Sequence, residues 1–185
     1  MNNDNGKIHD TLESVFHLVN NELFTAYNLE FESVARMTSA KEIDIPGPSL
    51  MSVLNASGEG VKILSAIKMS DVTAAHIYPG NKSNISREEL QDLCGELNNQ
   101  LVGKVKNKML AYECKLMLGL PTCITGTNLS SHTPQNSVAV ERVYKCDAGR
   151  VVVCLHTVVH PAFSMLDEPN NELTGEVSEG TLDFF

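Results

Sequence analysis

The sequence lacks a long apolar run and any excess of basic residues. It carries 14 Lys and Arg against 23 Asp and Glu, which gives a formal net charge of −9. Without a basic patch to offset phosphate repulsion, nucleic acids and anionic membrane surfaces are disfavoured as partners. No apolar stretch approaches the roughly 20 residues that a membrane-spanning helix needs. The first residues also lack a basic segment followed by an apolar one, so we expect a cytoplasmic protein.

Recognisable metal-ligand spacing is absent too. The five cysteines, at positions 94, 114, 123, 146 and 154, include no Cys-x-x-Cys pair, and most lie in apolar stretches. We therefore expect free, buried thiols and no metal site. His156 and His160 share one face of a predicted strand, but strand spacing separates them by about 13 Å, which is too far for one metal ion. A Gly-x-Ser-x-Gly motif, which would indicate Ser/His/Asp catalysis, is also missing.

The chain does have the size and composition of one folded domain. Its 185 residues, 42% of them hydrophobic, are enough for a packed core. Residues 166–185 differ, because they contain several acidic residues and no Lys or Arg. We expect a single domain over residues 1–165 and a disordered acidic tail over residues 166–185. The final Leu-Asp-Phe-Phe is compatible with a docking peptide or with a frayed end.

Hydrophobic periodicity and turn signals predict an α+β fold. An apolar stripe at helical spacing predicts a helix over residues 11–26, capped by Asp10 or Thr11 after a frayed start. The other predicted elements are, in order, a hairpin of strands 50–56 and 61–69, a short helix 71–77, a long helix from Ser86 to about Tyr112, and strands 115–125, 138–146 and 150–159. A polar loop is expected over residues 127–136. These elements indicate a mostly antiparallel sheet with the long central helix and the N-terminal helix packed on one face.

The long helix presents two contrasting faces. At about 100° per residue, its Leu residues, Cys94 and Val105 fall on one side, which we expect to pack against the sheet. Glu96 and Asn99 fall on the other side and, being three residues apart, share a face, whereas Asn98 points about 160° away from Glu96. By spacing alone, this acid–amide pair could be a solvated helix face or could reach into the active site of another protein.

One family has this pattern. The segment from Glu89 to Lys106, with Glu96-x-x-Asn99 followed by Gly103-Lys104, resembles the signature helix of the CheX-like branch of the CheC/CheX/FliY chemotaxis phosphatases. The continuation from Leu120 to Gly126, Leu-Pro-Thr followed by a short apolar stretch, also resembles that family. The order of elements matches over roughly residues 8–162. A single motif is present, which is similar to the single-site CheX branch rather than to members with two such helices.

The resemblance implies a function and a division of labour. It implies a phosphatase that hydrolyses the aspartyl phosphate of a response-regulator receiver domain, with catalytic residues Glu96 and Asn99. Asn99 would align the attacking water and Glu96 would pair with the receiver's lysine, while Asp92, Gly103 and Lys104 would contact the partner. The protein would need no cofactor of its own, because Mg²⁺ is expected on the phosphorylated receiver. Members of this branch tend to be homodimers, so a homodimer is expected.

Two other functions remain open. The same fold could be a non-catalytic binding module that docks a receiver or another signalling protein, or it could be a purely structural dimer. The presence of both Glu96 and Asn99 favours the enzyme. The acidic tail and the lack of a second motif favour the binding module. Binding of a phosphorylated receiver would separate the structural dimer from the other two.

Overall fold

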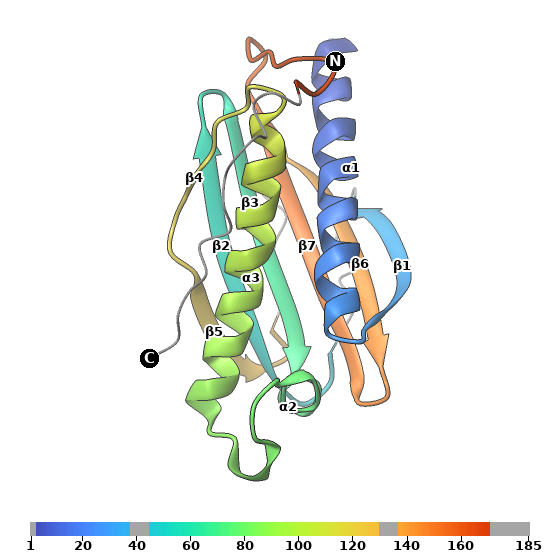
Figure 1. Ribbon diagram of the computed structural model, residues 1–185, viewed down its shortest axis with the longest axis vertical. Coiled ribbons are helices and arrows are strands. Elements are labelled where there is room, and N and C mark those ends of the chain that lie inside the picture. Colours follow the sequence, from blue (N-terminus) through green and yellow to red (C-terminus); the bar gives the residue numbers. More distant parts are fainter. Residues whose placement is uncertain (1–2, 38–44, 130–136, 171–185) are drawn as a thin grey trace.

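The computed structural model describes residues 3–37, 45–129 and 137–170. Within these ranges the chain forms a mostly antiparallel sheet and three α-helices (Figure 1). The helices are α1 (Asn3–Ala26), α2 (Asp71–Ile77) and α3 (Arg87–Leu110), and a short 3-10 turn spans Lys82–Asn84. The strands are β1 (Glu30–Met37), β2 (Pro48–Gly58), β3 (Val61–Ser70), β4 (Met117–Leu118), β5 (Thr122–Thr127), β6 (Val138–Cys146) and β7 (Gly149–Val159). The predicted α+β class is confirmed.

The sheet joins segments that are far apart in the sequence. Its strand order is β1-β6-β7-β3-β2-β4, and β5 pairs with the same edge of β2 as β4 does. Two hairpins, β2–β3 and β6–β7, meet where β3 lies beside β7. The β2–β3 hairpin and α2 lie where the sequence predicts them, because the turn at Gly58–Val61 and the cap at Ser70 are local signals.

α1 and α3 run antiparallel across one face of the sheet, as Figure 1 shows. Their apolar sides fill one continuous core with the strands behind them. Phe16 and Phe24 of α1 and Leu97 and Leu101 of α3 are completely buried in it. Burying such side chains contributes about 1.5–3 kcal/mol each, so this helix layer adds substantially to stability. The Lys108 ammonium of α3 also lies 3.4 Å from the Glu22 carboxylate of α1.

The start of α1 corrects the sequence prediction. The helix begins at Asn3, well before the predicted caps Asp10 and Thr11. Ile8 is 4% exposed, and Nδ1 of His9 lies 2.8 Å from the Thr157 hydroxyl of β7. Contacts with a strand near the other end of the sequence therefore hold this first part of the helix, and no local periodicity could reveal them.

Two strand predictions also need correction. β1 is absent from the predicted elements, yet it pairs with β6 over its length. The single strand predicted over residues 115–125 is two strands, β4 and β5, separated by Gly119-Leu120-Pro121. Proline has no N–H to donate to a strand ladder, which explains the interruption.

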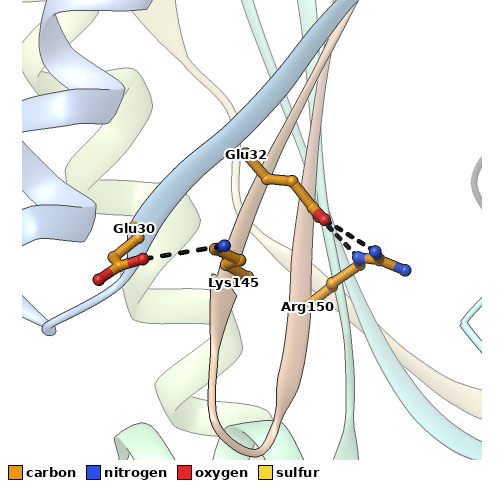
Figure 2. A network of polar contacts seen from close by, with 4 residues as sticks. All are labelled: Glu30, Glu32, Lys145 and Arg150. Carbon is orange, nitrogen blue, oxygen red and sulfur yellow. Dashed lines mark hydrogen bonds and ion pairs between the residues drawn. The ribbon is translucent and has the colours of Figure 1, made fainter.

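A bulge in β1 places one acidic side chain across two strands. The register advances by two residues between Phe31 and Ser33 while β6 advances by one, so Glu32 is the extra residue. Figure 2 shows Glu32 reaching past β6 to Arg150 of β7, whose Nε and Nη2 donate to its two carboxylate oxygens at 2.6 and 2.7 Å. The neighbouring pair, Glu30 and Lys145, is looser, at 3.9 Å.

The chain remains packed beyond residue 165. The backbone N–H groups of Leu166 and Asn170 donate to the carbonyls of Tyr112 and Ala111, just after α3. The Asp167 carboxylate lies 2.7 Å from Lys7 of α1. The folded part thus extends five residues past the predicted boundary at 165. Residues 171–185, with the Leu-Asp-Phe-Phe end, and residues 130–136 of the predicted loop lie outside the described ranges.

Candidate functional site

The site is built on α3, and the start of this helix is fixed as the sequence predicts. The Ser86 hydroxyl accepts from the Glu89 N–H at 3.2 Å, and Oε2 of Glu89 accepts from the Ser86 N–H at 2.7 Å. This reciprocal pair is a capping box. The Tyr78 hydroxyl also donates to Glu89 at 3.1 Å, and together these hydrogen bonds lower the pKa of the Glu89 carboxyl.

The buried side of α3 sets its rotation about the helix axis. The six apolar residues predicted to face the sheet are all buried: Leu90, Leu93, Cys94, Leu97, Leu101 and Val105. Asn98 is completely buried as well, and its amide donates to the carbonyls of Ser52 at 3.0 Å and Ser65 at 3.3 Å. Because an amide buried without partners would cost free energy, these bonds to β2 and β3 define one orientation of the helix. Glu96 and Asn99 therefore face outward.

Glu96 and Asn99 are half-buried rather than fully exposed. The Gln100 amide, one turn further along the helix, donates to Oε1 of Glu96 at 2.9 Å. This bond restricts the carboxylate through one of its two oxygens. Burial, together with the nearby Glu96 carboxylate, raises the pKa of the Tyr27 hydroxyl.

Neighbouring elements flank the pair on both sides. Tyr27, just after α1, lies within electrostatic range of Glu96. On the other side, a Cβ added to Gly95 would lie 4.0 Å from Cβ of Pro121, so the β4–β5 connection packs against α3 there. Leu120 in that connection is 87% exposed. The acid–amide face thus lies between the end of α1 and the β4–β5 connection.

The residues expected to contact a partner differ in their surroundings. Asp92 is exposed and Lys104 is half-buried, both on α3. Gly103 is one turn beyond Asn99, and a Cβ built there would meet no atom within 4 Å among the described residues. The fold therefore does not require glycine at this position. Glycine here even lowers the stability of the helix by about 1 kcal/mol relative to alanine.

Sequence reasoning missed Gln100 and Tyr27. Gln100 follows Glu96 by four residues, a spacing that brings helical side chains together, so this contact was readable from the sequence. Tyr27 reaches the site only through the packing of α1 on α3, for which the sequence gives no signal.

Other kinds of site find no support in the described part of the chain. It contains no cluster of three or more His, Cys, Asp or Glu residues that could hold a metal ion. His156 is buried in β7, whereas His160 is exposed just after that strand. Among the same residues, none of the helices combines the length and apolar character needed to cross a membrane.

Comparison with known proteins agrees with this arrangement. The family model described as chemotaxis phosphatase CheX matches residues 51–142, which include the whole of α3. No curated protein matches the chain.

Several solved structures share the fold. The CheX protein of Vibrio vulnificus has a TM-score of 0.69 at 14% identity, covering 80% of this chain and 99% of its own. A CheC-like superfamily protein from Shewanella sp. PV-4 has a TM-score of 0.63 at 20% identity, and the match covers 85% of this chain and 99% of that chain. The CheX–CheY–BeF₃–Mg²⁺ complex from Borrelia burgdorferi has a TM-score of 0.59 at 16% identity, and the match covers 80% of this chain and 96% of that chain. At these identities the likeness establishes the fold.

Proposed function

We propose, from the premise that this chain is a CheX-like member of the CheC/CheX/FliY chemotaxis phosphatase family, that it hydrolyses the aspartyl phosphate of a response-regulator receiver domain. The observation that carries the proposal is the pair Glu96 and Asn99, half-buried side by side on a helix whose rotation is fixed by Asn98. The family description and the CheX–CheY complex of a relative support the substrate class.

Asn99 is proposed to position the attacking water. An acyl phosphate is already reactive, and the receiver supplies Mg²⁺ and a lysine to balance the phosphoryl charge. What remains is to hold a water in line with phosphorus, so that its oxygen bonds to phosphorus as the aspartyl oxygen leaves. The amide oxygen of Asn99 can accept a hydrogen bond from this water, whereas a carboxylate would repel the phosphoryl oxygens. Such positioning is worth up to about 7–11 kcal/mol in ideal cases.

Glu96 is proposed to pair with the receiver's lysine. Its carboxylate is held through Oε1 by Gln100, which leaves Oε2 for the partner's cation. A charge pair of this kind contributes mainly to the rate and register of association rather than to the chemical step. Asp92, Gly103 and Lys104 extend the proposed contact surface along the same helix.

The test is dephosphorylation of acyl-phosphate-labelled receivers under single-turnover conditions. Asn99→Ala should slow the maximal rate at least about tenfold, a loss of about 1.4 kcal/mol of transition-state stabilisation. Glu96→Ala should mainly raise the protein concentration needed for the half-maximal rate. Glu59→Ala, an exposed acid in the β2–β3 turn, is the control and should behave as wild type.

Two results would contradict the proposal. Wild-type rates for Asn99→Ala would remove the water-positioning role. Tight binding of a receiver loaded with beryllofluoride and Mg²⁺, with no hydrolysis of any phosphorylated receiver, would instead establish the non-catalytic binding module.

A further inference from the structure

Two cysteines from distant parts of the sequence face each other between α3 and the edge of the sheet, close to Asn98. Cys123 of β5 pairs directly with Ser52 of β2. Residues paired across neighbouring strands project from the same face of the sheet. The amide of Asn98 on α3 donates to the Ser52 hydroxyl at 3.3 Å, so this face is the one that α3 covers. Cys123 therefore points toward α3.

Cys94 comes from the helix side of the same spot. It precedes Asn98 by one helical turn, so the two side chains share the buried face of α3. Its sulfur lies 3.8 Å from the carbonyl oxygen of Ile67, the residue that pairs with Ser52 from the other side. Both thiols therefore face the space between α3 and the β2–β5 edge of the sheet, and they are close enough to shift each other's pKa.

The two thiols differ in accessibility and acidity. Cys94 is completely buried, whereas Cys123 is half-buried at the sheet edge. The Cys94 side chain lowers the pKa of Cys123, against the opposing effects of burial and of the Asp92 carboxylate. The Cys123 side chain and burial raise the pKa of Cys94. The thiolate, which is the reactive form, is thus favoured at the sulfur that reagents can reach.

We propose that Cys94 and Cys123 form a peroxide-oxidisable pair in which Cys123 reacts first and Cys94 closes a disulfide between α3 and β5. The Cys123 thiolate attacks one oxygen of hydrogen peroxide, the O–O bond breaks, and sulfenic acid and hydroxide form. The Cys94 sulfur then attacks the Cys123 sulfur, the S–O bond breaks, and water leaves with the Cys94 proton. Sulfur is oxidised and peroxide is reduced, with no other reactant.

The remaining cysteines provide internal controls. Cys114 is buried, and burial raises its pKa to about 11, so it should resist peroxide. Cys146 on β6 is half-buried like Cys123, and it tests whether exposure alone is sufficient.

The experiment treats the reduced full-length protein with hydrogen peroxide, removes excess oxidant with catalase, and alkylates the remaining thiols after denaturation for peptide mass mapping. Alkylation should fall from all five free cysteines to three, and a peptide containing Cys94 joined to Cys123 should appear with the mass of two lost hydrogens. Cys123→Ser should abolish this peptide, while Cys114→Ser and Cys146→Ser should retain it.

A second variant tests whether Cys123 is oxidised before Cys94 reacts, and a substitute for it is available if it misfolds. In Cys94→Ala, Cys123 should persist as a sulfenic acid that dimedone captures; Cys94→Ser serves if the alanine variant fails to fold. The proposal is overturned if wild-type Cys123 becomes sulfinic acid while Cys94 remains alkylatable. It is equally overturned if Cys146 oxidises as fast as Cys123, or if all five thiols survive. None of these readouts requires a receiver, so they are independent of the proposed phosphatase activity.

Discussion

Two adjacent asparagines on α3 illustrate how a single residue's surroundings assign its role. Asn98 is buried and donates to strand carbonyls, whereas Asn99 is half-exposed beside Glu96. Asn98→Ala should lower the free energy of unfolding by about 1–3 kcal/mol, because those bonds to β2 and β3 are lost inside the core. Asn99→Ala should leave stability within about 0.5 kcal/mol of wild type while slowing dephosphorylation. Urea denaturation of both variants is the measurement, and equal losses of stability would refute the distinction.

Gly103 gives the opposite combination of effects. Gly103→Ala should raise the free energy of unfolding by about 0.5–1 kcal/mol, because the added methyl meets open space and alanine favours the helix. The same methyl should weaken binding of a receiver carrying beryllofluoride and Mg²⁺, since the proposed partner backbone lies there. Gly95→Ala is the matched control, because Gly95 is buried beside Pro121 and no partner can reach it. Unchanged binding by Gly103→Ala would remove Gly103 from the contact surface.

At this scale the sequence predicted which residues face outward but not how tightly they are held. The 3.6-residue period placed Glu96 and Asn99 opposite the leucines, and it separated Asn98 from them, because helix geometry depends only on position along the chain. The half-burial of the pair, the approach of Tyr27 and the contact between Pro121 and Gly95 depend on how α1 and the sheet edge pack against α3. These contacts are set by the tertiary structure, which the periodicity of a single helix does not reveal.

Among the elements, those with strong local signals were predicted, whereas β1, which only a distant strand holds, was not. α3 has a capping box and a long apolar period, α2 has a Ser cap, and β2–β3 has a tight turn. β1 has none of these signals: its described side chains, residues 30–35, are exposed and its pairing residues lie more than 100 positions away. The Pro121 that divides β4 from β5 was a readable signal that the prediction overlooked.

The bulge in β1 makes a pH-dependent contribution to stability. The hydrogen bonds from Arg150 lower the pKa of the Glu32 carboxyl, despite the opposing effect of burial. A group whose pKa is lower in the folded state stabilises that state above its unfolded pKa, and this contribution disappears as the pH falls through the folded pKa. Glu32→Gln should therefore melt below wild type at pH 7, and the gap should close as the pH falls below about 4.5, the ordinary glutamate pKa.

Glu30→Gln is the matched control for this prediction, because the Glu30–Lys145 pair is longer and Glu30 is 80% exposed. Its melting temperature should differ little from wild type at pH 7. A gap for Glu32→Gln that persists unchanged at pH 3 would show that the effect does not arise from ionisation of this carboxyl.

For the molecule as a whole, we expect a homodimer. β1 stands at the end of the strand order, so one edge of its backbone lacks a neighbouring strand among the described residues. Phe31 and Val34 on this strand are 45% and 49% exposed, so pairing of this edge with a second copy would cover apolar surface. Sedimentation velocity at micromolar concentration should show a dimer, and Val34→Lys should shift it toward the monomer if this edge is the interface. A monomeric wild type would contradict the expectation.

The position of β6 and β7 near the end of the described chain has a consequence for synthesis on the ribosome. The β2–β3 hairpin can close as soon as it emerges, but β1 must wait for β6, with Glu30 meeting Lys145, and His9 of α1 must wait for Thr157. Until then the apolar side of α1, with Phe16 and Phe24, has no sheet to cover it. Such long-range pairing slows folding. The nascent N-terminal segment is therefore the part of this protein that we expect chaperones to hold, and they should release it only after the last hairpin has been made.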